Sequence, residues 1–131
     1  MPRKAVSTNL APTSPSYSQA VIAGNLVFVS GTVGRDAVSG TWPDGVVAQA
    51  EQALRNLETI LREAGCGLDD VVKTTVFLTD TSHGALIADA YQRAFSAPLP
   101  ARSAPVVTGF PIPEPLISID AIAVLPHQES T

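Results

Sequence analysis

The chain has 131 residues, a hydrophobic content of 45% and a charged content of 15%, which predicts one folded domain with a sizeable core. Its formal net charge is −4 and its eight Lys and Arg residues do not cluster, so neither nucleic acid nor an anionic membrane is expected as its partner. A single cysteine, Cys66, excludes an intrachain disulfide, and the His and Cys residues lack the spacing of metal ligands.

The N-terminal segment "MPRKAVSTNLAPTSPSYSQ" lacks the apolar core of a signal peptide, and no apolar run is long enough to span a membrane. We therefore expect a soluble, cytoplasmic protein. Residues 1–16 are rich in Pro, Ser and Thr and are predicted to form an irregular arm. Residues 17–126 are predicted to form the single domain, and residues 127–131 a C-terminal tail.

The first regular elements are predicted to form a hairpin, because two apolar runs at 20–23 and 26–29 flank the turn pair Gly24-Asn25. A loop with the only tryptophan, Trp42, follows; such a residue is more often a packed loop anchor than a binding platform.

The clearest helix is predicted over 46–64. Apolar residues recur there at three- and four-residue steps, while the polar residues, Gln49 among them, fall on the other side. Gly65 is a natural stop for this helix. A β-branched run at 71–79 predicts a strand, and a second apolar periodicity predicts a helix that ends before "APLPA".

Two further strands are predicted, in "SAPVVTG" and "LISIDAIAVL". The element order β-β-α-β-α-β-β predicts an α+β fold with one sheet and both helices packed on one face. Several strands are apolar on both faces, so the face without helices needs a cover. We expect another copy of the chain to supply it, which predicts a homo-oligomer.

Two charged residues stand out. Asp120 lies within the apolar run "LISIDAIAVL", where a carboxylate is costly unless it is paired or functional. A structural role, as an ion pair or as a carboxylate that accepts backbone N–H bonds, and a functional role as an acid, base or water-orienting group are about equally consistent with this strand. Arg102, in "PLPARSAPVV", lies between small and rigid neighbours, and a guanidinium suits bidentate capture of a carboxylate.

The segments "SQAVIAGNLVFVSG", "DDVVKTTVFLTD", "AYQRAF", "PARSAPVV" and "SIDAIAV" together resemble the Rid (YjgF/UK114) family of reactive-intermediate deaminases over nearly the whole chain. The resemblance implies a chorismate-mutase-like fold, a homotrimer and active sites in clefts between subunits. It also implies that 2-imino or 2-enamino acids, such as 2-aminoacrylate and 2-iminopropionate, are hydrolysed to 2-keto acids and ammonia. No cofactor and no metal are expected.

The same resemblance implies roles for individual residues. Arg102 matches the arginine that binds the substrate carboxylate, and Asp120 matches a position usually held by glutamate, which orients the attacking water. Tyr17 matches a tyrosine near the mouth of the cleft, and Ser30 and Gly31 match the "SG" of the pocket wall.

Ala104 and Thr32 complete the expected substrate-binding set, and both depart from the family pattern. Ala104 replaces a common cysteine, although its backbone N–H could still serve, and Thr32 replaces a glutamine. Ala88 stands where many members have asparagine, and Asp120 is one methylene shorter than glutamate. These departures leave open a pathway-specialised Rid-fold enzyme for a larger substrate, or a non-enzymatic binding or regulatory trimer. Ribonuclease activity is also described in the family, but the acidic balance of this chain argues against it.

Overall fold

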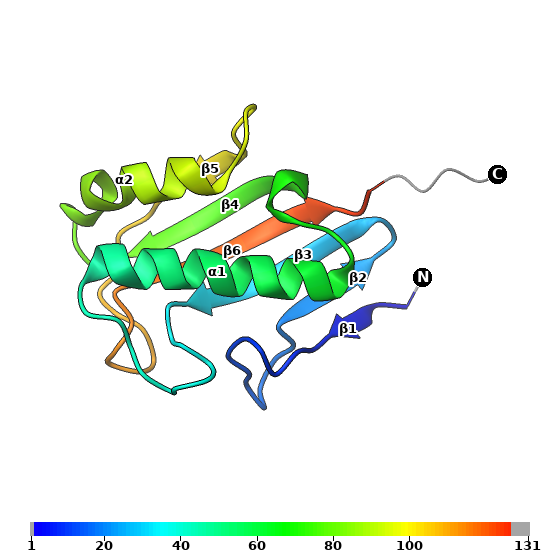
Figure 1. The fold of residues 1–131 in the computed structure, drawn as a ribbon, viewed down its shortest axis with the longest axis horizontal. Helices are drawn as coiled ribbons and strands as arrows, with labels where there is room; N and C mark the ends of the chain where they lie inside the picture. The colour runs from blue at the N-terminus through cyan, green and yellow to red at the C-terminus, as the bar shows by residue number, and fades with distance from the viewer. Residues whose placement is uncertain (1, 127–131) are drawn as a thin grey trace.

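The computed structural model describes residues 2–126, which form one six-stranded sheet with two α-helices packed on one of its faces (Figure 1). The elements are β1 (Lys4–Val6), β2 (Ala20–Ala23), β3 (Leu26–Val33), α1 (Val46–Ala64), a short 3₁₀ helix η1 (Leu68–Asp70), β4 (Val71–Leu78), α2 (His83–Ala94), β5 (Ala101–Ser103) and β6 (Ile117–Val124). The sheet order is β1-β2-β3-β6-β4-β5, in which only the β4–β5 pair is parallel. The predicted α+β fold class is confirmed.

Helix α1 begins and ends where the sequence predicts. Gly65 adopts a left-handed backbone with a φ of 97°, and its N–H donates to the carbonyl of Arg62 at 3.1 Å. The next N–H, from Cys66, donates to Leu61 at 3.0 Å, which completes a Schellman motif. The middle of the apolar stripe of α1, with Leu57 and Leu61, is fully buried against the sheet, whereas Val47 at its start is 39% exposed.

Two polar residues of α1 are buried rather than solvated and hold neighbouring loops. The side chain of Gln49, expected on the polar face, accepts a hydrogen bond from the Leu116 N–H at 2.8 Å and is only 4% exposed. Asn56 donates from Nδ2 to the carbonyls of Val33 and Arg35, each at 2.9 Å. Both side chains satisfy backbone groups of loops that have no ladder partner there, which is why they tolerate burial.

The chain differs from the sequence prediction at both sheet edges. Lys4–Val6, expected in an irregular arm, forms the edge strand β1 through pairing with β2. The strand expected in "SAPVVTG" begins earlier, as β5 at Ala101–Ser103, and continues only as an isolated bridge between Val106 and Leu78. Pro105 interrupts this strand because proline has no N–H to donate to the ladder.

The central strand β6 divides its side chains between the two faces of the sheet. Ile117, Ile119, Ala121 and Ala123 are buried on the face that carries the helices. Asp120 and Ile122 are half-buried on the other face, which we term the helix-free face. Ile122 there pairs with Phe28 of β3, whose side chain is 42% exposed. The expected apolar character of this face is therefore present in the structure.

Neither helix of the described residues is both long and apolar enough to cross a membrane.

Candidate functional site

Asp120 lies on the helix-free face at the middle of the sheet. Its Oδ1 accepts a hydrogen bond from the backbone N–H of Thr75, its cross-strand partner in β4, at 3.1 Å. Within residues 2–126 no Lys or Arg nitrogen lies within 4.0 Å of this carboxylate. The structural ion pair that the sequence left open is therefore not formed in the described part of the chain, whereas the other structural role, acceptance of a backbone N–H bond, is present.

A β-bulge in β3 faces Asp120. Val29 pairs with Ala121 and Thr32 pairs with Ile119, so two residues of β3, Ser30 and Gly31, lie opposite the single residue Asp120. Bulges of this kind occur beside active sites because they redirect side chains and interrupt the ladder. The structure thus brings together three of the residues named from the sequence: Ser30, Gly31 and Asp120.

Hydrogen bonds to the preceding segment hold the bulge in place. The Ser30 N–H donates to the carbonyl of Gln19 at 3.0 Å, and the Ser30 hydroxyl donates to the carbonyl of Ser18 at 2.7 Å. The hydroxyl of Thr32 is turned inward and donates to the Ser30 carbonyl at 2.9 Å. Thr32 is buried, and this hydrogen bond lets it act on the shape of the bulge.

Gly31 is required by a close approach between β3 and β6. A Cβ atom at this position would lie 2.8 Å from Oγ of Ser118, which is shorter than real Cβ contacts allow. Ser118 precedes Asp120 by two residues on β6 and is itself 7% exposed. The absence of a side chain at Gly31 therefore lets the bulge lie flat beside the strand that carries the carboxylate.

Tyr17 lies beside the bulge. It is 58% exposed and lines a hollow of about 40 Å³ together with Ser30, Gly31 and Thr32; Ile60 of α1 also lines this hollow, and Asp120 does not. A hollow of this size holds water but is too small for an amino-acid-sized ligand. One chain alone therefore offers the wall of a site and not a complete pocket.

Arg102 lies on the opposite face of the sheet, next to α2. Arg102 pairs with Thr74 in β4, and its guanidinium carbon lies 4.9 Å from the centre of the Tyr91 ring. The Tyr91 hydroxyl in turn shares a 2.7 Å hydrogen bond with the Thr74 hydroxyl. Arg102 is exposed, as is Ala104 immediately beyond the end of β5.

Arg102 and Asp120 do not meet within a single chain. Strand β4 separates their two strands, which places the backbones roughly 10 Å apart at two interstrand spacings. Their side chains also leave the sheet on opposite faces, since Arg102 pairs with buried Thr74 and Asp120 pairs with Thr75. A reaction that needs both groups would have to draw them from different copies of the chain.

Two residues of the helix-free face were not identified from the sequence as part of the site: Lys73 and Thr75, both in β4. Lys73 lies beside Ile122, and its ammonium donates to the carbonyl of Thr74 at 2.8 Å and to the hydroxyl of Thr75 at 3.3 Å. The polar triplet within the apolar run "VVKTTVFL" is the signal that could have indicated them.

The remaining chemical groups lie apart from this face. Burial raises the pKa of the Cys66 thiol, with a further contribution from the charge of Asp70, so its nucleophilic thiolate form is disfavoured. Within residues 2–126 no group of three or more His, Cys, Asp or Glu residues is placed to hold a metal ion.

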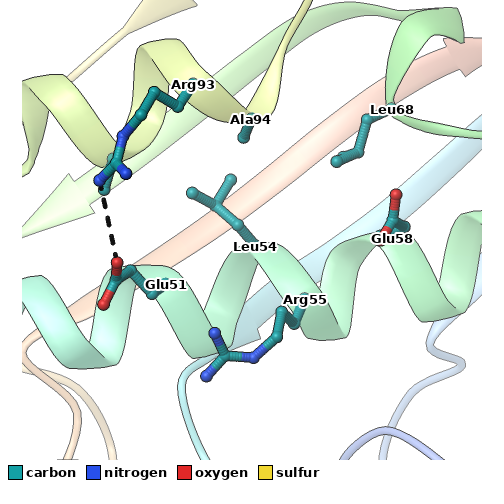
Figure 2. Close-up of a pocket in the computed structure, with 8 residues that line it drawn as sticks. Glu51, Leu54, Arg55, Glu58, Leu68, Arg93 and Ala94 are labelled. Carbon is teal, nitrogen blue, oxygen red and sulfur yellow. Dashed lines mark ion pairs between the residues drawn. The ribbon is translucent and has the colours of Figure 1, made fainter.

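A groove of about 240 Å³ lies between α1 and α2, on the side of the sheet away from Asp120 (Figure 2). Leu54 and Leu68 form apolar parts of its lining, and Arg93 reaches across it toward Glu51 at 4.0 Å. None of the residues predicted for the site lines this groove.

The fold and the site define a small α+β domain with a carboxylate beside a β-bulge on the open face of the sheet and an arginine on the other face. The chain belongs to the family described as "Endoribonuclease L-PSP", which matches residues 8–125. It is 44% identical to the rat protein named 2-iminobutanoate/2-iminopropanoate deaminase over 93% of this chain and 90% of that protein.

Solved structures agree with this membership. The crystal structure of RidA from the Antarctic bacterium Psychrobacter sp. PAMC 21119 superposes with a TM-score of 0.89 at 37% identity, covering 93% of this chain and 99% of that chain. E. coli TdcF, solved with bound serine, gives a TM-score of 0.86 at 34% identity, covering 92% of this chain and 98% of that chain. The expected Rid membership is confirmed.

The close approach at Gly31 generates a test by paired substitution. We expect Gly31→Ala to lower the free energy of unfolding by about 1–3 kcal/mol, because the new methyl group overpacks against the Ser118 hydroxyl. Adding Ser118→Ala should recover most of this loss. Thermal unfolding of the two single variants and of the double variant measures the free energy of unfolding of each. Additive losses in the double variant would contradict the contact.

Proposed function

We propose that this protein hydrolyses 2-imino acids and their 2-enamino tautomers to 2-keto acids and ammonia. The observation that carries the proposal is the 44% identity with the rat deaminase over 93% of the chain. The gathering of Ser30, Gly31 and Asp120 at one bulge supports it, since these are the positions that the family resemblance associates with the reaction.

In the proposed reaction, Arg102 binds the substrate carboxylate and Asp120 holds a water molecule beside the imine carbon. The water oxygen adds to that carbon, and the electron pair of the C=N bond moves to nitrogen. One proton of the added water passes to the nitrogen to give the carbinolamine, the remaining hydroxyl proton follows it, and the C–N bond breaks with its electron pair on nitrogen, so that ammonia leaves as the carbonyl forms. An iminium carbon is already electrophilic, so orientation of the reactants can supply most of the rate enhancement.

We propose that each active site combines Arg102 of one subunit with Asp120 of a neighbouring subunit in a homotrimer. The separation of the two residues within one chain supports a shared site. The exposed Phe28 on the helix-free face supports burial of this face against another subunit, because large apolar side chains that gather on an open face mark association surfaces.

The description of the family names an RNA-cleaving activity, and the charge of this chain argues against it here. The sequence has twelve acidic and eight basic residues, whereas binding to an RNA backbone requires a concentration of positive charge. We therefore propose a small imino acid, and not RNA, as the substrate.

The roles of the two charged residues predict different kinetic effects. We expect Arg102→Ala to raise KM by about 10- to 100-fold, since it removes charge-assisted hydrogen bonds to the carboxylate. We expect Asp120→Asn to lower kcat by about 100-fold, since the water loses its anionic acceptor and the amide cannot take up a proton. The assay uses 2-iminopropionate generated in situ by an amino-acid oxidase and trapped with semicarbazide.

Two variants provide matched controls for this assay. Arg62→Ala and Asp89→Asn remove exposed charges of the same types from the helices and should leave both constants unchanged. Wild-type protein that does not accelerate loss of the imine would disprove the proposed function. Full activity of Arg102→Ala would disprove the assigned role of the arginine.

A shared site also predicts complementation between inactive subunits. When Arg102→Ala and Asp120→Asn chains are refolded together in equal amounts, about one subunit interface in four should carry both native residues. The mixture should then regain about a quarter of wild-type activity, whereas the separate variants remain impaired. If the mixture is no more active than the mean of the two separate variants, Arg102 and Asp120 of a site come from the same subunit.

The proposed trimer can be tested by its mass and by a substitution in its expected interface. Light scattering after size exclusion should give about three times the chain mass of 13.6 kDa. Phe28→Lys should shift the protein toward monomer, because it places a charge in the buried interface. Val38→Lys is the control, since Val38 is 88% exposed in the loop between β3 and α1. A wild-type monomer would contradict the assembly.

A further inference from the structure

One peptide group of β4 connects a lysine with the carboxylate of the proposed site. The ammonium of Lys73 donates to the Thr74 carbonyl at 2.8 Å, and the N–H of the same peptide, that of Thr75, donates to Oδ1 of Asp120 at 3.1 Å. We propose that Lys73 is a positioning residue that fixes Asp120 through this peptide. The inference rests on the proposed function, because it assigns Asp120 to the reaction.

The physical basis is polarisation of the peptide dipole. A cation at the carbonyl oxygen draws electron density away from the N–H, which makes that N–H a stronger donor to an anion at its other end. Each peptide carries a dipole of about 3.5 D, and here opposite charges lie at its two ends in the favourable sense. Lys73 therefore strengthens the hydrogen bond that orients the Asp120 carboxylate.

A second β-bulge places Lys73 on the face where it can act. Val71 pairs with Ala123 and Lys73 pairs with Ile122, so Val72 has no partner in β6. Val71 and Thr74 are both buried toward the helices, although residues an odd number of positions apart normally face opposite sides of a strand. The extra residue therefore shifts the alternation of β4 by one position. Under strict alternation from Val71, Lys73 would point into the core.

The ammonium of Lys73 forms no ion pair in the described part of the chain. Within residues 2–126 no carboxylate oxygen lies within 4.0 Å of it, and its hydrogen bonds go to two neutral oxygens, of Thr74 and Thr75. A half-buried cation held in this way needs compensation from its surroundings. The carboxylate of Asp120, at the far end of the same peptide, supplies it.

The test compares Lys73→Met with Lys4→Met, the same change at the chain's other lysine, which is exposed on β1. Lys73→Met should lower kcat by about tenfold, less than the roughly 100-fold cost of a 1 Å misplacement, and should leave KM within about twofold. In NMR spectra the Thr75 amide proton should move upfield as its hydrogen bond weakens. Lys4→Met should change none of these quantities.

If the methionine variant does not fold, Lys73→Gln serves as a second neutral variant. Lys73→Arg keeps the charge and its donors and should restore most of kcat. An unchanged Thr75 resonance in the neutral variants would overturn the proposal, as would a raised KM with unchanged kcat or a loss confined to thermal stability. Wild-type protein inactive on imines would disprove the proposed function alone, since the Thr75 resonance still decides whether Lys73 acts on Asp120.

Discussion

The alternation of side chains along β6 is the constraint on which the rest of the structure depends. Alternate residues of this strand, Ile117 and Ile119 among them, fill the core under the helices. The residues between them, Ser118 and Asp120 among them, project from the other face. Because a strand has a side-chain period of two, any slip by one residue would place the carboxylate in the core and the isoleucines outside. Core packing and site placement are therefore fixed by the same register.

The two bulges adapt the neighbouring strands to this register. The Ser30–Gly31 bulge in β3 opens the ladder opposite Asp120, and the Val72 bulge in β4 turns Lys73 and Thr75 toward the same face. The site is thus built from regular strands with one extra residue on each side of the carboxylate. Such a wall is rigid, because it belongs to the sheet and not to a mobile loop.

The sequence was sufficient for the elements that carry strong local signals. The periodicity of 46–64 with Gly65 predicted α1, and Gly24-Asn25 predicted the hairpin, because these signals act within a few residues. The edge strand β1 escaped prediction, and the strand expected in "SAPVVTG" begins earlier as β5, because these short strands are recruited by backbone hydrogen bonds to a partner rather than by a side-chain pattern.

The site could be predicted only in part, for a related reason. Asp120 stood out because a carboxylate in an apolar strand is costly, and the family resemblance drew attention to Ser30 and Gly31. Lys73 did not, because a bulge changes the direction of a side chain without changing composition, and simple alternation gives no sign of the extra residue. The separation of Arg102 from Asp120 likewise follows from strand order, which no local pattern records.

The stacking of Arg102 on Tyr91 has a consequence for affinity. An exposed contact between a guanidinium and an aromatic ring stabilises the unliganded protein by about 0.5–1 kcal/mol. If a ligand carboxylate draws the guanidinium off the ring, that energy is subtracted from the binding free energy, and the dissociation constant rises by about two- to fivefold. In the proposed site, the aromatic ring thus competes with the substrate carboxylate for the arginine, which it holds in a defined conformation at a small loss of affinity.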